Sequence, residues 1–283
     1  HKEKMPSSIF KDNILKGKVA LITGGGTGIN FAITRQLGLH GCKVVIIGRR
    51  KHKLDEAVQK LTADGVDSFA IPGDVRNIES IKAFVNGTVD HFGQIDILVN
   101  GAAGNFLCCA EDLTPSGFKT VIDIDLNGTF LTSLTCFPHL KKSKGVIINL
   151  SATLHMGATD FQVHASAAKA GIDAITRNLA LEWGAAYGIR CLSIAPGPIG
   201  GTVGMQKLAP KGTQNALANF IPLRRMGTVD DIGYTVVFLV SEAASYITGT
   251  SIVVDGGHIL MRPAPPRSYV KAVTKKHKLK AKL

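Results

Sequence analysis

The sequence has no apolar run that approaches the roughly 20 residues of a membrane-spanning helix, so no membrane span is expected. Charged residues are only 19% of the 283 residues and hydrophobic residues are 45%, which excludes a disordered or fibrous chain. Cysteine is scarce, and its odd number and spacing suit neither a disulfide framework nor a metal site. With no N-terminal secretion signal, we expect reduced thiols inside a cell: Cys42, Cys108, Cys109, Cys136 and Cys191.

Acidic residues are absent from residues 262–283, which hold eight Lys and Arg and so most of the net charge of +12. Such a stretch can bind nucleic acid nonspecifically, but a solvated tail is the simpler interpretation, and no specific nucleic-acid partner is expected. The sequence ends Ala281-Lys282-Leu283, one residue different from the peroxisomal Ser-Lys-Leu signal. This ending predicts delivery to the peroxisome by its import receptor.

Short apolar runs rich in β-branched residues alternate with amphipathic stretches along the chain. Apolar character at nearly every position is typical of strands that are covered on both faces. The alternation predicts an α/β fold with a doubly wound, mostly parallel seven-stranded sheet. We expect one domain over residues 17–258, an N-terminal extension over 1–16 and a basic tail over 259–283. The predicted strands are residues 19–23, 43–47, 68–71, 95–99, 145–150, 190–194 and 251–254.

A glycine-rich turn follows the first predicted strand and precedes a helix. Backbone N–H groups of such a turn can approach a pyrophosphate at the helix N-terminus. The candidate residues are Gly24, Gly25, Gly26, Thr27, Gly28 and Ile29. After the second strand the chain has bases where an NAD enzyme would place an acid, which favours the 2′-phosphate of NADP. These bases are Arg49, Arg50 and Lys53.

Four further signals follow later predicted strands in order. They are Gly73-Asp-Val-Arg76, Asn100-Gly-Ala-Ala-Gly104, Ser151 and Pro196-Gly-Pro-Ile199. All of them fall at the edge of the sheet where this architecture binds ligands. Together with the glycine turn, these segments resemble the short-chain dehydrogenase/reductase superfamily over residues 17–258. The resemblance implies a Rossmann fold and a bound nicotinamide dinucleotide, in these positions: Asp74 and Val75 beside the adenine, Asn100 beside the cofactor, Lys169 on the nicotinamide ribose, and Pro196, Gly197, Pro198, Ile199 and Thr202 over the nicotinamide.

Two positions depart from the superfamily pattern. The third glycine of the fingerprint is Asn30, where a side chain would stand between the helix and the cofactor. The tyrosine expected four residues before Lys169 is Ala165. Because ordinary carbonyl reduction needs that phenol as a proton donor, the chain is either inactive or catalyses a different reaction.

One branch of the superfamily that lacks this tyrosine is similar to the chain. The segments that carry the similarity are Asn100–Leu107, Phe118–Asp125, Gln162–Ala170 and Ala195–Ile199. They resemble the 2,4-dienoyl-CoA reductases, whose mitochondrial members place a replacement tyrosine where this chain has Leu154. Peroxisomal members lack it too and carry an aspartate at the position of Asp125. The resemblance therefore implies NADPH-dependent reduction of a 2,4-dienoyl-CoA to a 3-enoyl-CoA by a peroxisomal member.

The resemblance implies four catalytic residues. Asp125 would position or relay a protonating water, Asn127 would donate to the thioester oxygen or hold a water, Lys169 would hold the ribose, and Ser151 would assist them. Each also has a structural interpretation: Asp125 as a satisfied helix carboxylate, Asn127 as a backbone-bonded amide, Lys169 as a solvent-facing helix lysine, and Ser151 as a strand-end cap. His164 is more simply a packed histidine than an acid.

An acyl-CoA substrate carries several phosphates, so bases are expected at the mouth of its site. By resemblance the substrate residues are Arg49, Arg76, Phe106, Thr114, Pro115, Ser116 and Lys207. Arg76 in a surface ion pair is an equally simple interpretation. The segment 202–222 is predicted to be a lid, with hinges at Gly200, Gly201, Gly204 and Gly212.

Three other functions stay open at this point. They are a peroxisomal trans-2-enoyl-CoA reductase, a non-catalytic NADP- or acyl-CoA-binding protein, and a nucleic-acid binder that uses the tail. The resemblance also implies a homotetramer, assembled through long helices near 115–138 and 162–186.

Overall fold

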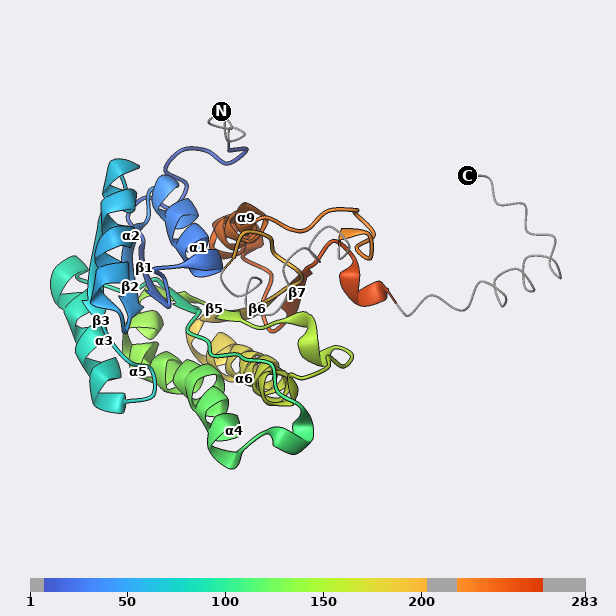
Figure 1. Ribbon diagram of the computed structural model, residues 1–283. Coiled ribbons are helices and arrows are strands. Elements are labelled where there is room, and N and C mark those ends of the chain that lie inside the picture. Colours follow the sequence, from blue (N-terminus) through green and yellow to red (C-terminus); the bar gives the residue numbers. More distant parts are fainter. Residues whose placement is uncertain (1–7, 203–217, 262–283) are drawn as a thin grey trace, which may run out of the picture.

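The computed structural model describes residues 8–202 and 218–261. Within them the chain forms one parallel sheet with helices on both faces (Figure 1). The strands are β1 (Val19–Thr23), β2 (Lys43–Gly48), β3 (Ser68–Pro72), β4 (Ile97–Asn100), β5 (Val146–Leu150), β6 (Arg190–Pro196) and β7 (Ser251–Val254). The helices are α1 (Gly28–Leu39), α2 (Lys51–Ala63), α3 (Ile78–Phe92), α4 (Pro115–Val121), α5 (Gly128–Ser143), α6 (Val163–Tyr187) and α9 (Val229–Val240).

The sheet confirms the predicted fold class. Its order is β3-β2-β1-β4-β5-β6-β7, and every neighbouring pair is parallel. The order reverses between β1 and β4, so the loops after these strands diverge and leave a crevice at their carboxyl ends. β4 begins at Ile97, two residues later than predicted. Asp96, just before it, accepts the N–H of Val19 through its carboxylate at 2.8 Å.

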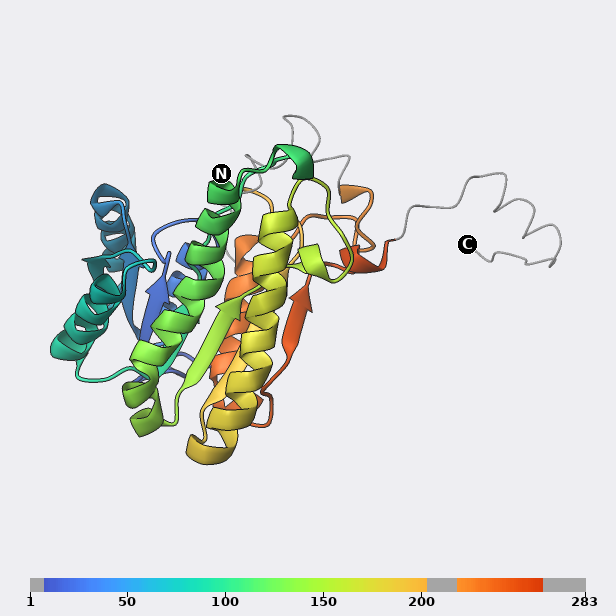
Figure 2. The same cartoon turned by 90° about the horizontal axis from the view of Figure 1, so that it is seen from below.

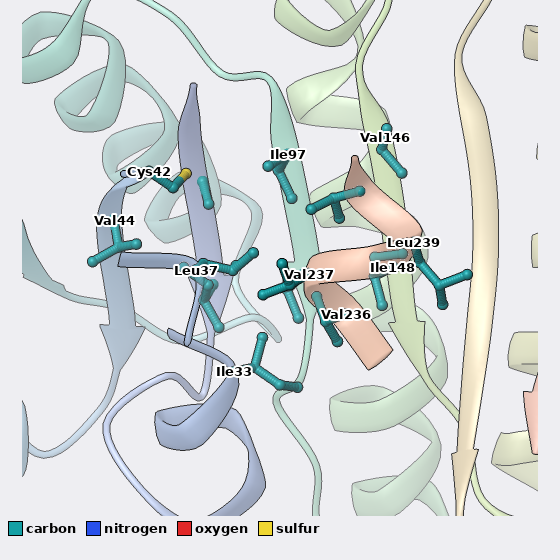
Figure 3. Packing of buried hydrophobic residues seen from close by; sticks show 14 of the residues in the cluster. Ile33, Leu37, Cys42, Val44, Ile97, Val146, Ile148, Val236, Val237 and Leu239 are labelled. Atoms are coloured by element: carbon teal, nitrogen blue, oxygen red, sulfur yellow. The ribbon is translucent and has the colours of Figure 1, made fainter. Parts of the chain in front are cut away.

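Each face of the sheet is closed by its own apolar layer. On one face α1 and α9 cover the strands, and Leu37 of α1 and Val237 of α9 pack in the same buried cluster as Ile148 of β5 (Figure 3). On the other face α3, α5 and α6 lie side by side (Figure 2), and Phe84 and Leu140 are fully buried there. The strands are therefore apolar on both sides, as a sheet covered on both faces requires.

The N-terminal segment is less separate than the sequence suggested. Leu15 is only 2% exposed and joins the core beneath α1 and α9, and its N–H donates to the carbonyl of His40 at 2.9 Å. Phe10 stacks on Tyr234 of α9. The part of the predicted extension from residue 8 onward therefore packs on the domain, whereas residues 1–7 lie outside the described residues.

Short turns complete the described fold. The 3₁₀ turns are Ala110–Asp112, Thr153–His155, Glu242–Ala244 and His258–Leu260, and a π-helical turn, Ile122–Asn127, joins α4 to α5. The start of the predicted basic tail is thus a helical turn, and residues 262–283, with the predicted targeting signal, lie outside the described residues. In the two described ranges, no helix has both the length and the apolar character of a bilayer-crossing segment.

Candidate active site

A cavity of about 280 Å³ lies at the carboxyl ends of the first four strands, where the strand order reverses. Its walls come from the loops after β1, β2, β3 and β4, which are four of the six loops that the sequence singled out. This is the place where open parallel sheets bind nucleotides. The lining residues are Gly24, Gly26, Thr27, Asn30, Ile47, Gly48, Arg49, Arg50, Lys53, Leu54, Gly73, Asp74, Val75, Gly101, Ala102, Ala103 and Ile124.

The glycine turn brings bare backbone to this cavity. Gly24 has a φ of +71°, and a Cβ there would lie 3.0 Å from the carbonyl oxygen of Gly101. Thr27, at the N-cap of α1, makes no side-chain capping bond, and the first turn of α1 holds no acid. The N–H groups at the start of α1 therefore lack a side-chain partner and face an anion-binding position.

Only part of the predicted pyrophosphate loop lines the cavity. A Cβ on Gly25 would lie 2.7 Å from Ile46, so this glycine serves the packing of the turn against β2. Ile29 packs against the core under α1. Gly28 lines a neighbouring hollow between α1 and α2. Of the predicted set, Gly24, Gly26 and Thr27 line this cavity, and the pyrophosphate role of the loop stays a prediction.

The basic residues after β2 stand beside the turn. Arg49 and Arg50 line the cavity and are exposed, and α2 begins one residue later without an acid in its first turn. Lys53 lines the same wall but pairs with Glu56 at 2.7 Å. Two guanidinium groups at this wall suit a phosphate on the adenosine side of a dinucleotide.

Arg76 forms a surface ion pair, which is the alternative that the sequence left open. Its guanidinium contacts the carboxylate of Asp74 through Nη2 at 2.5 Å and through Nε at 3.0 Å. This hydrogen bond holds the pKa of Asp74 below the usual range of an aspartate. Asp74 still lines the cavity, as predicted, but Arg76 is occupied by an ion pair rather than free at its mouth.

Asn100, which the resemblance placed beside the cofactor, is not among the residues that line this cavity. Its side-chain amide donates to Ser133 and to Asn149, both at 2.9 Å, and Asn149 in turn donates to Thr176 of α6. Asn100 is buried, so its amide ties β4 to α5 and β5. The cavity wall is formed instead by the three residues that follow it.

Two buried residues of opposite charge form an ion pair beneath this wall. Lys169 Nζ lies 2.9 Å from Asp125 Oδ2 and 2.9 Å from the carbonyl oxygen of Leu150. The N–H of Gly104 donates to Asp125 Oδ1 at 2.7 Å. Asp125 is 1% exposed and Lys169 7% exposed. An ion pair this deeply buried is stabilised because each charged group contacts its opposite charge and also a backbone dipole.

The π-helical turn explains how Asp125 enters the interior. Turns of this kind often mark functional sites, because the extra residue reorients a side chain within an otherwise regular helix. Asn127, two residues on, points to the outer face, where its amide donates to Asp123 at 2.9 Å. The structure therefore does not bring Asn127 to Lys169, and the donor role predicted for it is not supported by this geometry.

Ala165 stands one turn before Lys169 on the same face of α6 and is 1% exposed. Ser151 is buried at the end of β5, and its hydroxyl has no hydrogen-bond partner among the described residues. One turn after Lys169, Asp173 binds His155 Nε2 at 2.7 Å and the hydroxyl of Ser193 at 2.8 Å. The sequence analysis missed His155 and Asp173. Asp173 could have been found, because it follows Lys169 by four residues and so lies on the same face of α6.

The loop after β4, which holds the predicted acyl-side residue Phe106, contacts the start of α6. Phe106 stacks on His164 with ring centroids 4.3 Å apart, and His164 Nε2 lies 3.1 Å from the carbonyl oxygen of Phe106. The amide of Asn105 donates to Gln162 at 2.6 Å. His164 is fully buried, which favours the packed interpretation, and Phe106 stays partly exposed beside it.

The Thr114–Ser116 turn, also predicted to line the acyl side, caps a helix. Thr114 accepts the N–H of Gly117 at 3.1 Å, and Pro115 is the first residue of α4. Phe106 lies next to this turn, since a Cβ on Gly117 would be 3.3 Å from its ring. The turn is therefore near the predicted acyl side, with Thr114 engaged in the cap.

None of the residues predicted to cover the nicotinamide lines the first cavity. Pro196 ends β6, and Gly197 donates its N–H to the carbonyl of Val254 at 3.0 Å. Pro198 accepts from the N–H of Gly227 at 3.0 Å, which keeps this turn close to the start of α9. Thr202 donates to Ile199, which lines a second cavity of about 600 Å³. Lys207 and most of the predicted lid lie outside the described residues.

Known proteins match this arrangement over most of the chain. A family model described as enoyl-(acyl carrier protein) reductase matches residues 24–258. The chain is 48% identical to the peroxisomal 2,4-dienoyl-CoA reductase of Arabidopsis thaliana, described as (3E)-enoyl-CoA-producing, over 95% of this chain and 93% of the relative. The chain belongs to the 2,4-dienoyl-CoA reductases of the short-chain dehydrogenase/reductase superfamily. A Saccharomyces cerevisiae enzyme of the same description is 45% identical over 88% of this chain and 86% of its own.

Other members of the family extend the comparison. A probable 2,4-dienoyl-CoA reductase of Bacillus subtilis, described as (2E)-enoyl-CoA-producing, is 41% identical over 87% of this chain and 98% of its own. A short chain dehydrogenase of Bacillus anthracis superposes with a TM-score of 0.79 at 39% identity, over 88% of this chain and 98% of that one. Membership makes the chain an oxidoreductase with a nicotinamide cofactor. The cavity residues fit such a group, because bare N–H groups and two guanidinium groups face it.

Proposed function

We propose that the chain reduces 2,4-dienoyl-CoA thioesters to 3-enoyl-CoA with NADPH, in the β-oxidation of unsaturated fatty acids. The observation that carries the proposal is the buried Asp125–Lys169 pair, one helical turn from Ala165. An enzyme for alcohols or ketones would need a phenol at position 165. A diene does not, since the reaction can proceed with other donors near the thioester.

The chemistry explains why a carboxylate and an ammonium group suffice. A bound NADPH would supply the hydride, which adds at Cδ of the diene. Negative charge then spreads to the thioester oxygen as a dienolate, which needs hydrogen-bond donors and a proton at Cα. Asp125 would hold the water that delivers this proton, and Lys169 has one N–H left for a ligand after its two contacts. Ser151, whose buried hydroxyl has no hydrogen-bond partner in residues 8–202 and 218–261, is a further donor at this edge.

The preference for NADPH rests on the wall after β2. Arg49 and Arg50 line the cavity, and they are the first two residues after the strand, where an acid would favour NADH. A phosphate bound there would replace water around both guanidinium groups and face the start of α2. The expected signature is a large loss of NADPH affinity on substitution of Arg49 or Arg50, with little change for NADH.

We also place the protein in the peroxisome as a homo-oligomer. The Arabidopsis and yeast relatives are described as peroxisomal. Large apolar side chains stand exposed on the outer faces of α5 and α6: Phe130, Leu134 and Leu181. Exposed apolar side chains on two adjacent helices suit a contact with a second copy of the chain. A tetramer of this chain would appear at four times 30.0 kDa by light scattering.

The proposal is tested with purified protein, NADPH and 2,4-hexadienoyl-CoA. We expect NADPH oxidation and a 3-enoyl-CoA product. Faster turnover of a trans-2-enoyl-CoA would favour the competing reductase, and a 2-enoyl product would match the description of the Bacillus subtilis relative instead. Binding of NADPH without turnover of either thioester would overturn the proposal. A double substitution of Arg49 and Arg50 by Ala tests the cofactor preference, with Lys51→Ala, on the neighbouring exposed position, as the matched control.

A further inference from the structure

Asn30 occupies the third residue of α1, at the position where the superfamily fingerprint has a glycine. Its amide does not project freely into the cavity. Asn30 Nδ2 donates to the carbonyl oxygen of Gly101 at 2.6 Å, across the crevice between the loops after β1 and β4. Asn30 therefore connects two cavity walls that a glycine would leave separate.

Gly101 is shaped to accept this side chain. A Cβ at position 101 would lie 2.4 Å from Asn30 Oδ1 and 2.5 Å from its Cγ, so a side chain there would force the Asn30 amide out of its position. The φ of Gly101 is not in the left-handed region, so the conflict is one of space and not of backbone strain. Residues 30 and 101 are thus fitted to each other: the Asn30 amide keeps its contact with the carbonyl of residue 101 when that residue is glycine.

The segment that Asn30 holds continues to the catalytic pair. Thr23 Oγ1 accepts the N–H groups of Gly101 and Ala102 at 3.0 and 3.1 Å, so the start of the segment is fixed from two sides. Three residues later the N–H of Gly104 donates to Asp125 Oδ1. Asn30 is therefore connected to Asp125 by a short path: a hydrogen bond from its amide to Gly101, the backbone of residues 101–104, and a hydrogen bond from the Gly104 N–H to the carboxylate.

We propose that Asn30 is a positioning residue for the reaction: by holding Gly101 it sets the segment 101–104 and, through Gly104, the orientation of the Asp125 carboxylate. The role rests on the proposed function only where turnover is the readout. If Asn30 served the nucleotide alone, its substitution would change NADPH affinity and leave the chemical step untouched. Within the described residues, the one hydrogen bond that the Asn30 side-chain amide donates goes to Gly101, so we expect the opposite.

The first test separates kcat from NADPH binding. Asn30→Asp keeps the shape of the side chain but turns a carboxylate toward the Gly101 carbonyl, and we expect kcat to fall about tenfold or more. Asn30→Gly, which restores the fingerprint, should lower kcat about two- to tenfold. The NADPH dissociation constant, from nucleotide fluorescence, should stay within about threefold of wild type in both variants. Asn178→Asp is the matched control, since that amide also donates to a backbone carbonyl, on the exposed face of α6.

The second test needs no substrate. Gly101→Ala should destabilise the nucleotide-free protein toward urea, and Asn30→Gly in the same chain should restore most of that loss by removing the clash. If wild type shows no turnover, the proposed function fails. The contact between Asn30 and Gly101 is still tested in that case, by the urea unfolding of the single and double variants and by their NADPH affinity. Additive effects of the two substitutions would overturn the proposal. So would an Asn30→Asp variant with normal kcat and weakened NADPH binding.

Discussion

Lys169 and Asp125 form an ion pair at 2.9 Å in which both partners are also held by backbone, Lys169 by the carbonyl of Leu150 and Asp125 by the N–H of Gly104. The pair joins three elements: α6, the π-helical turn and the segment after β4. Its charges stay in a fixed orientation without help from solvent, since both side chains are buried. With alanine in place of the tyrosine at position 165, the Asp125 carboxylate is a fixed group available for catalysis beside the cofactor cavity.

Asp125→Asn tests the carboxylate while it preserves the side-chain shape. We expect kcat to fall by about 10²–10⁴, because the neutral amide would lose the ion pair with Lys169 and hold the protonating water less firmly, and the NADPH affinity to change little. Asp123→Asn is the control, since Asp123 lies on the outer face of the same turn and pairs with Lys119. Full activity of the Asp125 variant would remove the carboxylate from the reaction.

Ala165→Tyr tests whether the site has room for the phenol that it lacks. Ala165 is buried against the sheet, so the ring must displace its neighbours, and we expect a loss of about 1–3 kcal/mol in the free energy of unfolding. Turnover of the dienoyl substrate should fall and no alcohol dehydrogenase activity should appear. Ala186→Tyr, at an exposed position of α6, controls for the bulk of the ring. An Ala165→Tyr variant as stable as wild type would show that the space around residue 165 is larger than the structure indicates.

Thiol reactivity tests the burial of the cysteines. Burial raises the pKa of the Cys191 thiol to about 12, and it also raises the pKa of Cys42 and Cys136. The thiolate is the nucleophile, so these three should resist iodoacetamide at pH 8 in the folded protein. Only the partly exposed Cys108 and Cys109 should be modified, whereas all five should react in urea, as measured by mass spectrometry. Rapid labelling of Cys191 in the folded state would contradict the fold.

The start of α9 carries a capping box that can be weakened without touching the site. Thr228 and Asp231 each accept the other's backbone N–H. Thr228→Ala should lower the free energy of unfolding by about 1 kcal/mol in urea at pH 7, with kcat unchanged. Thr62→Ala, in the exposed end of α2, should cost much less. Equal losses in the two variants would argue against the box.

The same box predicts a dependence on pH. A hydrogen bond from Arg225 lowers the pKa of Asp231 in the folded protein, so the folded state holds this carboxylate ionised more firmly than the unfolded state does. The resulting stability is present above the ordinary pKa of an aspartate and is lost as pH falls through the lowered value. Asp231→Asn should therefore be less stable than wild type at pH 7, and the difference should shrink in acid. A difference independent of pH would assign the effect to shape alone.

The fold was largely predictable because its signals are local. Strands covered on both faces are apolar at nearly every position, and the glycine turn, the bases after β2 and the missing tyrosine are each visible in consecutive residues. All seven strands were located, with boundaries within two residues. The packing of Leu15 was not predictable, since nothing near it in the sequence marks its contact with α1 and α9.

The site was harder to predict, because its contacts join distant residues. Asp125 and Asn127 lie two residues apart in the sequence, and only the π-helical turn decides which of them enters the interior. From the sequence, Arg76 suited a substrate phosphate and a surface ion pair equally well. Its ion pair with Asp74 depends on the side-chain conformation, which the sequence does not show. The partners of Asn100 lie 33 and 49 residues away, beyond any local pattern.

The central claim is that the site delivers a hydride to the far end of a conjugated diene and a solvent proton beside the thioester. It is tested most directly by turnover of 2,4-hexadienoyl-CoA with NADPH deuterated at C4 of the nicotinamide, followed by NMR of the product. We predict a 3-enoyl-CoA with the label at C5, and solvent deuterium at C2 when the reaction is run in heavy water. Label at C3, or a 2-enoyl product with solvent deuterium at C4, would contradict the account.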